Sequence, residues 1–261
     1  MNLRRGRFLA PSLFTLGNMA CGFYALLSIQ RDEFVPAATA ILLGMAFDSL
    51  DGRVARFVHG ESTFGVEFDS LSDFLTFGIA PAHMMYAFIL KDYGVWGYPM
   101  AFVYALCGAL RLARFNAGVH DHVGSKTSFT GLPIPGGAGF LASFVLLYQI
   151  IEQGRPARTW AFLMNQVPAL YGLAPAMVLI IAFLMISTIP YPAFKKSSFL
   201  RPRSVWLPPL LVFAAAIIFI YPQNAIFLIF FAYVLMGPVG WMLGLARRAL
   251  RRAPPPSPDG V

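Results

Sequence analysis

Charged residues are scarce in this chain. Asp, Glu, Lys and Arg make up 12% of its 261 residues, and 57% of the residues are hydrophobic, whereas soluble domains average about 25% charged and about 45–50% apolar residues. A water-soluble core cannot hide this much apolar surface. Apolar runs of about 20 residues recur between Pro11 and Leu245, which is the length that a helix needs to cross a bilayer. The composition therefore predicts a polytopic membrane protein.

Cysteine is almost absent, which removes disulfide frameworks and thiol metal sites from consideration. Cys21 and Cys107 lie in apolar runs without partners at metal-ligand spacing, so we interpret them as small helix residues. The first apolar run, 8–29, lacks the cleavage pattern of a signal peptide, and the N-terminus is expected to stay on the protein. The net charge of +8 forms no basic stripe with interleaved aromatics, which argues against nucleic acid as a partner.

Basic residues gather at the ends of the apolar runs. Because positively charged residues near transmembrane helices stay on the cytoplasmic side, these clusters mark cytoplasmic ends. We therefore expect a multi-pass protein of the cell (inner) membrane with both termini in the cytoplasm. Arg155 and Arg158 fall on the external side, against the rule, but they are outnumbered. The cytoplasmic clusters are Arg4, Arg5 and Arg7; Arg53 and Arg56; Arg111 and Arg114; Lys195, Lys196, Arg201 and Arg203; and Arg247, Arg248, Arg251 and Arg252.

The hydrophobic pattern predicts an all-α bundle of about eight transmembrane helices. A basic cytoplasmic N-terminus, 1–10, precedes a transmembrane domain, 11–247. The basic and proline-rich tail, 248–261, is expected to be disordered because it has little apolar surface to pack. The predicted spans cover residues 11–29, 34–58, 64–90, 95–116, 135–151, 169–189, 206–221 and 224–245, with external breaks at 30–33 and 91–94.

Four aspartates interrupt the second and third predicted spans. Asp48 and Asp51 share one face of a helix, and Asp69 and Asp73 share a face of the next helix at four-residue spacing. A short turn around residues 59–63 would lay the two faces against each other. Carboxylates at membrane depth are costly unless something pairs with them, so their presence indicates a functional site.

Carboxylates this close together cannot all remain ionised without compensation, because like charges repel. A divalent cation removes the conflict, and Mg²⁺ typically combines a few carboxylates with phosphate oxygens. Gly52 and Ala55 let a bulky nucleotide approach the helix, and Gly65 leaves room beside the carboxylates. The spacing therefore predicts a site for a metal-bound diphosphate. Two alternatives stay open: aspartates that cap helices or pair with nearby arginines, and the cation pathway of a transporter.

The same stretch matches a known signature. Asp-x2-Asp-Gly-x2-Ala-Arg-x8-Gly-x3-Asp-x3-Asp, from Asp48 to Asp73, resembles the signature of the CDP-alcohol phosphatidyltransferases at all eight fixed positions. Further segments resemble the membrane-bound phosphatidylserine synthases of that family: PSLFTLGNMACG at 11–22, SDFLTFGIAPA at 72–82, RLARFN at 111–116 and GLPIPGGAG at 131–139. Ser12 stands where relatives often have Asn, and it can still form hydrogen bonds. The C-terminal spans resemble only generic hydrophobic helices.

The resemblance implies a fold, a reaction and partners. The family has a core of about six helices that dimerises in the membrane, so two C-terminal spans would be an addition. The implied enzyme transfers a phosphatidyl group from CDP-diacylglycerol to the hydroxyl of L-serine and releases CMP, with the site at the cytoplasmic rim among membrane lipids. The acceptor could instead be glycerol 3-phosphate, inositol phosphate or choline. A carboxylate-dependent cation transporter is the alternative from another class.

The resemblance also implies roles for individual residues. The four aspartates, Asp48, Asp51, Asp69 and Asp73, would hold Mg²⁺ or Mn²⁺, and Asp73 is the candidate general base. Arg111 and Arg114 could bind a carboxylate or phosphate of the acceptor, or could simply anchor the helix end. The run 131–139 could line the acceptor pocket through Pro133 and Pro135, or could be a turn and packing seam. The expected nucleotide contacts are Ser12, Asn18, Asp51, Gly52, Ala55, Arg56 and Gly65.

Overall fold

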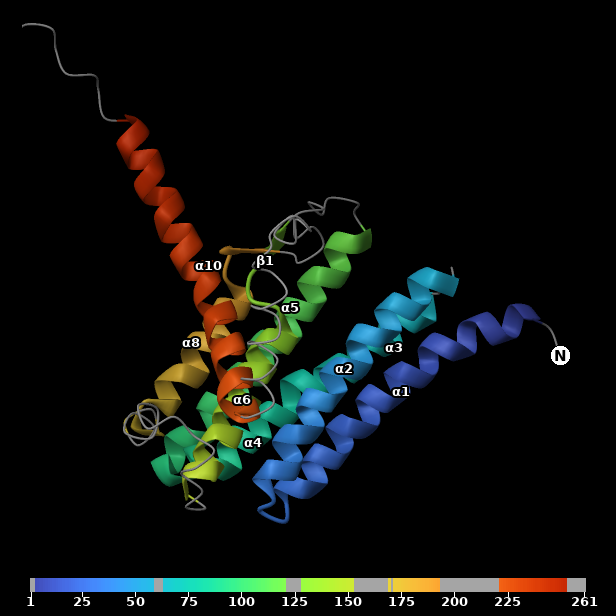
Figure 1. The fold of residues 1–261 in the computed structure, drawn as a ribbon, viewed down its shortest axis with the longest axis horizontal. Coiled ribbons are helices and arrows are strands. Elements are labelled where there is room, and N and C mark those ends of the chain that lie inside the picture. Colours follow the sequence, from blue (N-terminus) through green and yellow to red (C-terminus); the bar gives the residue numbers. More distant parts are fainter. Residues whose placement is uncertain are drawn as a thin grey trace, which may run out of the picture.

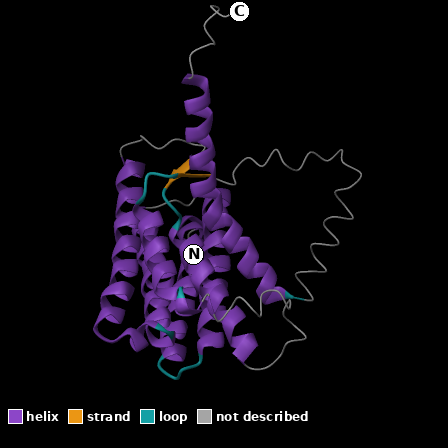
Figure 2. Cartoon of the chain, turned by 90° about the vertical axis from the view of Figure 1, so that its left-hand side faces the viewer, coloured by secondary structure: helices purple, strands orange, loops and turns teal. Residues whose placement is uncertain are grey.

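The protein is a bundle of long helices (Figures 1 and 2). The computed structural model describes residues 3–58, 63–120, 128–152, 169, 171–192 and 221–252. Helices suit these apolar segments because a helix satisfies its backbone hydrogen bonds internally, without water. Seven of the eight predicted spans coincide with helices; the other, 206–221, lies almost wholly outside the described residues.

The first two helices form an antiparallel hairpin. Helix α1 covers Leu3–Ile29 and helix α2 covers Phe34–Val58, so the predicted connector 30–33 and both bounds of the second span are confirmed. The chain reverses through Asp32, which has a φ of 58°, a backbone conformation that Asp tolerates better than most residues. The helices then pack along their length, as Figure 1 shows.

The third span is one continuous helical run with an irregular centre. Helix α3, Thr63–Asp73, passes into a π-helical segment, η1, Phe74–Ile79, and then into helix α4, Ala80–Phe88. A π-helix is rare and shifts the register of the faces that follow it. The buried Tyr104 hydroxyl donates a hydrogen bond to the Phe77 carbonyl at 3.2 Å, which stabilises this segment from a neighbouring helix.

The remaining elements complete the bundle and add a small strand pair. The 3₁₀ segment η2, Leu90–Trp96, contains the predicted break and has a non-helical Gly94. Strand β1, Ser128–Thr130, pairs antiparallel with strand β2, Pro190–Pro192, and Phe129 lies opposite Tyr191. The other elements are α5, Gly97–His120; α6, Ile134–Glu152; α8, Ala174–Ile186; and α10, Pro222–Arg252.

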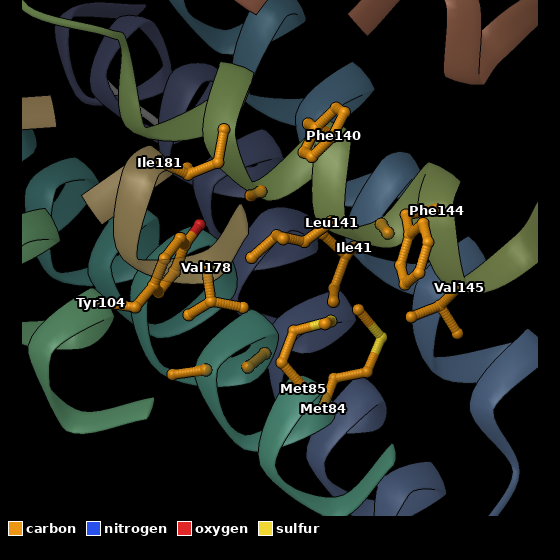
Figure 3. Close-up of a cluster of buried hydrophobic side chains, with 14 of the residues drawn as sticks. Ile41, Met84, Met85, Tyr104, Phe140, Leu141, Phe144, Val145, Val178 and Ile181 are labelled. Atoms are coloured by element: carbon orange, nitrogen blue, oxygen red, sulfur yellow. The ribbon is translucent and has the colours of Figure 1, made fainter. Parts of the chain in front are cut away.

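The core lies where α2, α4, α5, α6 and α8 meet. Figure 3 shows buried side chains of these helices in one cluster, among them Tyr104, Met84, Met85, Leu141 and Phe144. These five side chains are fully buried. The core therefore fixes how the N-terminal hairpin and the C-terminal helices sit relative to each other.

Three helical segments in the described part of the chain are long and apolar enough to cross a membrane: Phe34–Val54, Leu90–Ala117 and Pro222–Gly244. Shorter apolar helices cover Leu13–Ile29, Ile134–Gln149 and Ala174–Ile186. Large hydrophobic side chains such as Leu43 and Phe102 are exposed on the outside of the bundle, as expected for contact with lipid. These features agree with an integral membrane helix bundle.

Helix α10 continues further than the sequence pattern predicts. It runs to Arg252, so residues 248–252 are helical, although the tail was expected to be disordered from 248. Arginine and alanine favour helix, which explains how the helix propagates beyond its apolar part. Residues 253–261 lie outside the described residues. Figure 2 shows this end of α10 projecting from the bundle.

Candidate active site

Three of the predicted aspartates converge on one point. Asp48 and Asp51 on α2 and Asp69 on α3 each offer a carboxylate oxygen, and these oxygens all lie within 4.8 Å of one another. Asp51 is only 5% exposed, and its carboxyl group contacts that of Asp69. Two carboxyl groups in contact need a proton or a cation between them. The predicted approach of the two helix faces is therefore confirmed for these three aspartates, and Asp73 lies outside the group.

Helix α1 supplies hydrogen-bond donors to this acidic cluster. The Thr15 hydroxyl donates to Asp51 Oδ2 at 3.0 Å, and the Asn18 amide donates to Asp73 Oδ1 at 2.9 Å. Both side chains are buried, and three-residue spacing places them on one face of the helix. Each donor holds a carboxylate in one orientation. Asn18 was expected at the nucleotide, and Thr15 was not singled out by its sequence pattern.

Small residues allow α1 to approach closely enough for these contacts. A Cβ on Gly22 would collide with the Thr76 side chain, and a Cβ on Gly44 would lie 2.6 Å from Thr76 and 2.9 Å from Asn18 Oδ1. The Thr76 hydroxyl donates to the Asn18 carbonyl at 2.9 Å, and Ser72 donates to the Thr15 carbonyl at 3.1 Å. The start of the π-helical segment is thus tied to the backbone of α1 behind the carboxylates.

The donor set fits a hard divalent cation. Asp69 Oδ1 is buried and has no hydrogen-bond partner within the described part of the chain. A buried carboxylate oxygen without a donor is costly unless a cation meets it. The ligand atoms of Asp48, Asp51 and Asp69 are all carboxylate oxygens, the type that Mg²⁺ and Mn²⁺ prefer. These three residues could together bind a metal ion.

A polar bridge connects α3 to α5 beside the cluster. The Asn116 amide donates to the Ser70 hydroxyl at 3.0 Å, and that hydroxyl donates to the Val66 carbonyl at 3.1 Å. Ser70 follows Asp69 directly in the chain. The bridge therefore holds α3, which carries Asp69, against α5, which carries the two predicted arginines.

The two arginines of α5 differ in their surroundings. Arg111 is buried, interacts electrostatically with Asp73 and Tyr233, and has an Nε without a hydrogen-bond partner among the residues described. Arg114 is exposed and donates to the Ile186 carbonyl at 2.8 Å, at the C-terminus of α8. A cation at that position complements the helix dipole. Arg111 therefore remains available to a ligand, whereas Arg114 has a structural partner.

The two prolines of the 131–139 run line an apolar cleft. Pro133 and Pro135 face Met45 of α2 and Tyr233 of α10 across a volume of about 460 Å³. Met45 precedes Asp48 by one helical turn, so the cleft begins close to the acidic cluster. The walls are hydrocarbon, which suits an apolar chain. Helix α10 therefore forms a wall of this cleft, although the sequence pattern did not single it out.

For some of the residues predicted to contact the nucleotide, the structure describes only the backbone. Ser12 lies within α1, and Ala55 and Arg56 lie in the last turn of α2; their side chains lie outside the described residues. Gly52 and Gly65 are half-buried on α2 and α3, on the same two helices as the carboxylates. All five residues lie on helices, and their contacts with a nucleotide stay a prediction.

Comparison with known proteins agrees with this geometry. A family model described as CDP-alcohol phosphatidyltransferase matches residues 8–246. A Helicobacter pylori protein named CDP-diacylglycerol--serine O-phosphatidyltransferase is 30% identical over 238 residues, covering 90% of this chain and 92% of the relative. Proteins of the same name are 37% identical over 175 residues in Methanocaldococcus jannaschii, covering 67% of this chain and 71% of the relative, and 31% identical over 186 residues in Bacillus subtilis, covering 71% and 91%. The chain belongs to the CDP-alcohol phosphatidyltransferase family.

Proposed function

We propose that this protein is a phosphatidylserine synthase. It transfers the phosphatidyl group of CDP-diacylglycerol to the hydroxyl of L-serine and releases CMP. The acidic cluster of Asp48, Asp51 and Asp69 carries the proposal, because an all-carboxylate site in an apolar bundle suits a metal-bound diphosphate. The family membership supplies the reaction class, and the names of the relatives support serine as the acceptor.

In the proposed reaction, the serine oxygen bonds to the β-phosphorus and the bond from that phosphorus to the oxygen bridging to CMP breaks. Asp48, Asp51 and Asp69 would hold one or two Mg²⁺ or Mn²⁺ ions, which would offset the charge of the diphosphate and the CMP leaving group. Asp73 takes the proton from the serine hydroxyl, which is a weak nucleophile at neutral pH. The hydrogen bond from Asn18 orients the Asp73 carboxylate for this step. Asp73 could alternatively complete the coordination of a second ion.

Arg111 is the best candidate for binding the carboxylate of serine. Its guanidinium is buried, it lies close enough to Asp73 to interact with it electrostatically, and its Nε has no partner within the described residues. Guanidinium binds carboxylates with directional, charge-assisted hydrogen bonds. A carboxylate held there would place the serine hydroxyl beside the proposed base. Arg114, which binds the end of α8, orients that helix in this proposal.

The apolar cleft bounded by Met45, Pro133 and Pro135 suits an acyl chain of CDP-diacylglycerol. The nucleotide would then lie along α1 to α3, against Ser12, Gly52, Ala55, Arg56 and Gly65. This arrangement keeps the lipid tails in hydrocarbon while serine enters from water. The basic clusters indicate that this end of the bundle faces the cytoplasm of the inner membrane, with both termini on that side. The proposal includes a homodimer, because the resemblance to the family implies one.

One assay tests the proposal. The purified protein is incubated with CDP-diacylglycerol, Mg²⁺ or Mn²⁺, and one acceptor at a time, and CMP release is measured. We expect release that depends on L-serine and on the metal. Ethanolamine keeps a hydroxyl and an amine but lacks a carboxylate, so it should be a poor acceptor if Arg111 binds the carboxylate. Release with glycerol 3-phosphate, inositol phosphate or choline instead of serine would reassign the acceptor, and no release with any acceptor would contradict the proposed chemistry.

A further inference from the structure

Helix α10 contains a proline that breaks its hydrogen-bond ladder. Pro238 lies inside the helix and has no N–H, so it cannot donate to the carbonyl four residues earlier. That carbonyl belongs to Val234, which is buried at 6% exposure. A buried carbonyl without a donor is unfavourable, because it has lost its hydrogen bonds to water and gained none in return. The sequence of α10 therefore creates a requirement for a donor from elsewhere in the fold.

Tyr191 of β2 supplies that donor. Its hydroxyl donates to the Val234 carbonyl at 3.0 Å, and the side chain is fully buried. Its ring occupies the notch left by Gly237, where a Cβ would collide with it. Burial, and secondarily Tyr233, raises the pKa of Tyr191 to about 12, so the hydroxyl keeps its proton near neutral pH. Tyr191 thus fits the proline interruption in both shape and hydrogen bonding.

The backbone around Tyr191 connects this contact to the 131–139 run. Tyr191 pairs with Phe129 in the strand pair, which lies beside α10 in Figure 1. The Gly131 N–H donates to the Ile189 carbonyl at 2.9 Å. Gly131 has a φ of 80°, and a Cβ there would collide with the Met185 carbonyl, so glycine is required at this position. The position of Tyr191 is therefore coupled to the segment that leads into Pro133.

Tyr233 lies between this contact and the proposed acceptor site. Its ring centroid is 5.8 Å from that of Tyr191. Its ring edge packs on Gly136, where a Cβ would lie 2.7 Å from Cε1. Tyr233 also borders the apolar cleft and interacts electrostatically with Arg111. Because Val234 follows Tyr233 directly, the hydrogen bond that fixes Val234 also restricts where the Tyr233 ring can lie.

We propose that Tyr191 is a positioning residue. By donating to the Val234 carbonyl, which Pro238 leaves without a donor in its own helix, Tyr191 holds Tyr233 beside Arg111. It thereby shapes the acceptor side of the site. This inference rests on the proposed function, because it assigns the acceptor carboxylate to Arg111. It makes the C-terminal helix part of the enzyme's specificity, beyond its role as a membrane anchor.

The test is a double-mutant cycle in which the KM for serine is measured for each variant. Tyr191→Phe removes the hydroxyl and keeps the ring, and we expect the KM for serine to rise about tenfold, with a smaller change in the KM for CDP-diacylglycerol. Pro238→Ala restores the N–H that can bond the Val234 carbonyl within the helix. In the Pro238→Ala background, Tyr191→Phe should therefore change the serine KM by less than about twofold. Tyr233→Phe serves as a second probe and should raise the serine KM without adding to the effect of Tyr191→Phe.

The control is Tyr93→Phe, which removes another tyrosine hydroxyl bonded to a backbone carbonyl, that of Gly172 at 3.5 Å, at the opposite end of the bundle. It should leave the serine KM unchanged.

The inference is overturned if Tyr191→Phe leaves the serine KM unchanged, or if it lowers thermal stability and alters both KM values equally. It is also overturned if the effect persists fully in a folded Pro238→Ala background. If Pro238→Ala does not fold, the KM split of Tyr191→Phe and its non-additivity with Tyr233→Phe decide. Serine-dependent CMP release by the unmutated protein separates these outcomes from a failure of the proposed function.

Discussion

The hydroxyl of Thr15 is expected to determine how tightly the acidic cluster binds its metal. Thr15→Val removes the hydroxyl that donates to Asp51 Oδ2 at 3.0 Å and leaves a side chain of similar shape. Asp51 is 5% exposed, so water cannot replace the lost donor easily. A hydrogen bond to a charged group contributes about 1.5–3 kcal/mol, and loss of a partner of a metal ligand typically weakens metal binding about 10- to 100-fold.

The assay is CMP release as a function of Mg²⁺ or Mn²⁺ concentration at saturating CDP-diacylglycerol and serine. We expect the metal concentration for half-maximal activity to rise about 10- to 100-fold in Thr15→Val, and Thr15→Ser, which keeps the hydroxyl, to remain close to the unmutated protein. Thr39→Val is the matched control, because the exposed Thr39 hydroxyl donates to the Val35 carbonyl within its own helix, away from the acidic cluster. An unchanged metal requirement in Thr15→Val, or an equal rise in Thr39→Val, would refute the reasoning.

Three further predictions test the other parts of the site. Asp73→Asn keeps the shape of the side chain but removes the proposed base, so kcat should fall about 10²- to 10⁴-fold while the thermal stability changes little; near-normal turnover would contradict the proposed role. Arg111→Lys should raise the serine KM about tenfold, because lysine cannot bind a carboxylate bidentately, and Arg114→Lys should lower the melting temperature and leave that KM unchanged; the reverse pattern would exchange their roles. Gly22→Ala forces a Cβ against Thr76 and should destabilise the protein by about 1–3 kcal/mol, whereas Gly240→Ala, with open space around it, should be neutral or stabilising in the same thermal-shift measurement.

The helices and the acidic cluster are the parts that could be predicted from the sequence. The connector 30–33 and the bounds of α2 are confirmed because polar residues end two long apolar runs. Three of the four predicted aspartates converge because their spacing places them on facing stripes of two successive helices. In both cases the signal is local: residues close in the sequence determine the result through helical periodicity.

The π-helical segment and the strand pair could not be predicted in this way. The segment Phe74–Ile79 reads as part of an uninterrupted apolar helix, and its irregularity depends on partners such as Thr76 bonding to α1 and Tyr104 bonding to Phe77. The strands are three residues long and lie about 60 positions apart in the chain. Neither feature has a periodic signature of its own, because both arise from contacts between distant segments.

Thr15 and Tyr191 are residues whose roles could not be predicted from the sequence, although the acceptors that they bind could be. Both side chains meet a requirement set elsewhere in the sequence: Asp51 needs a donor inside an apolar bundle, and Pro238 leaves the Val234 carbonyl without one. The sequence predicts that an acceptor needs a donor, since buried carboxylates and helix-interior prolines each imply an unpaired acceptor. It does not predict which residue donates, because several hydroxyl-bearing residues lie in the other apolar segments. In a helical membrane protein, polar side chains that satisfy such acceptors are therefore the first places to look for residues that position the site, even where they lie outside the family signature.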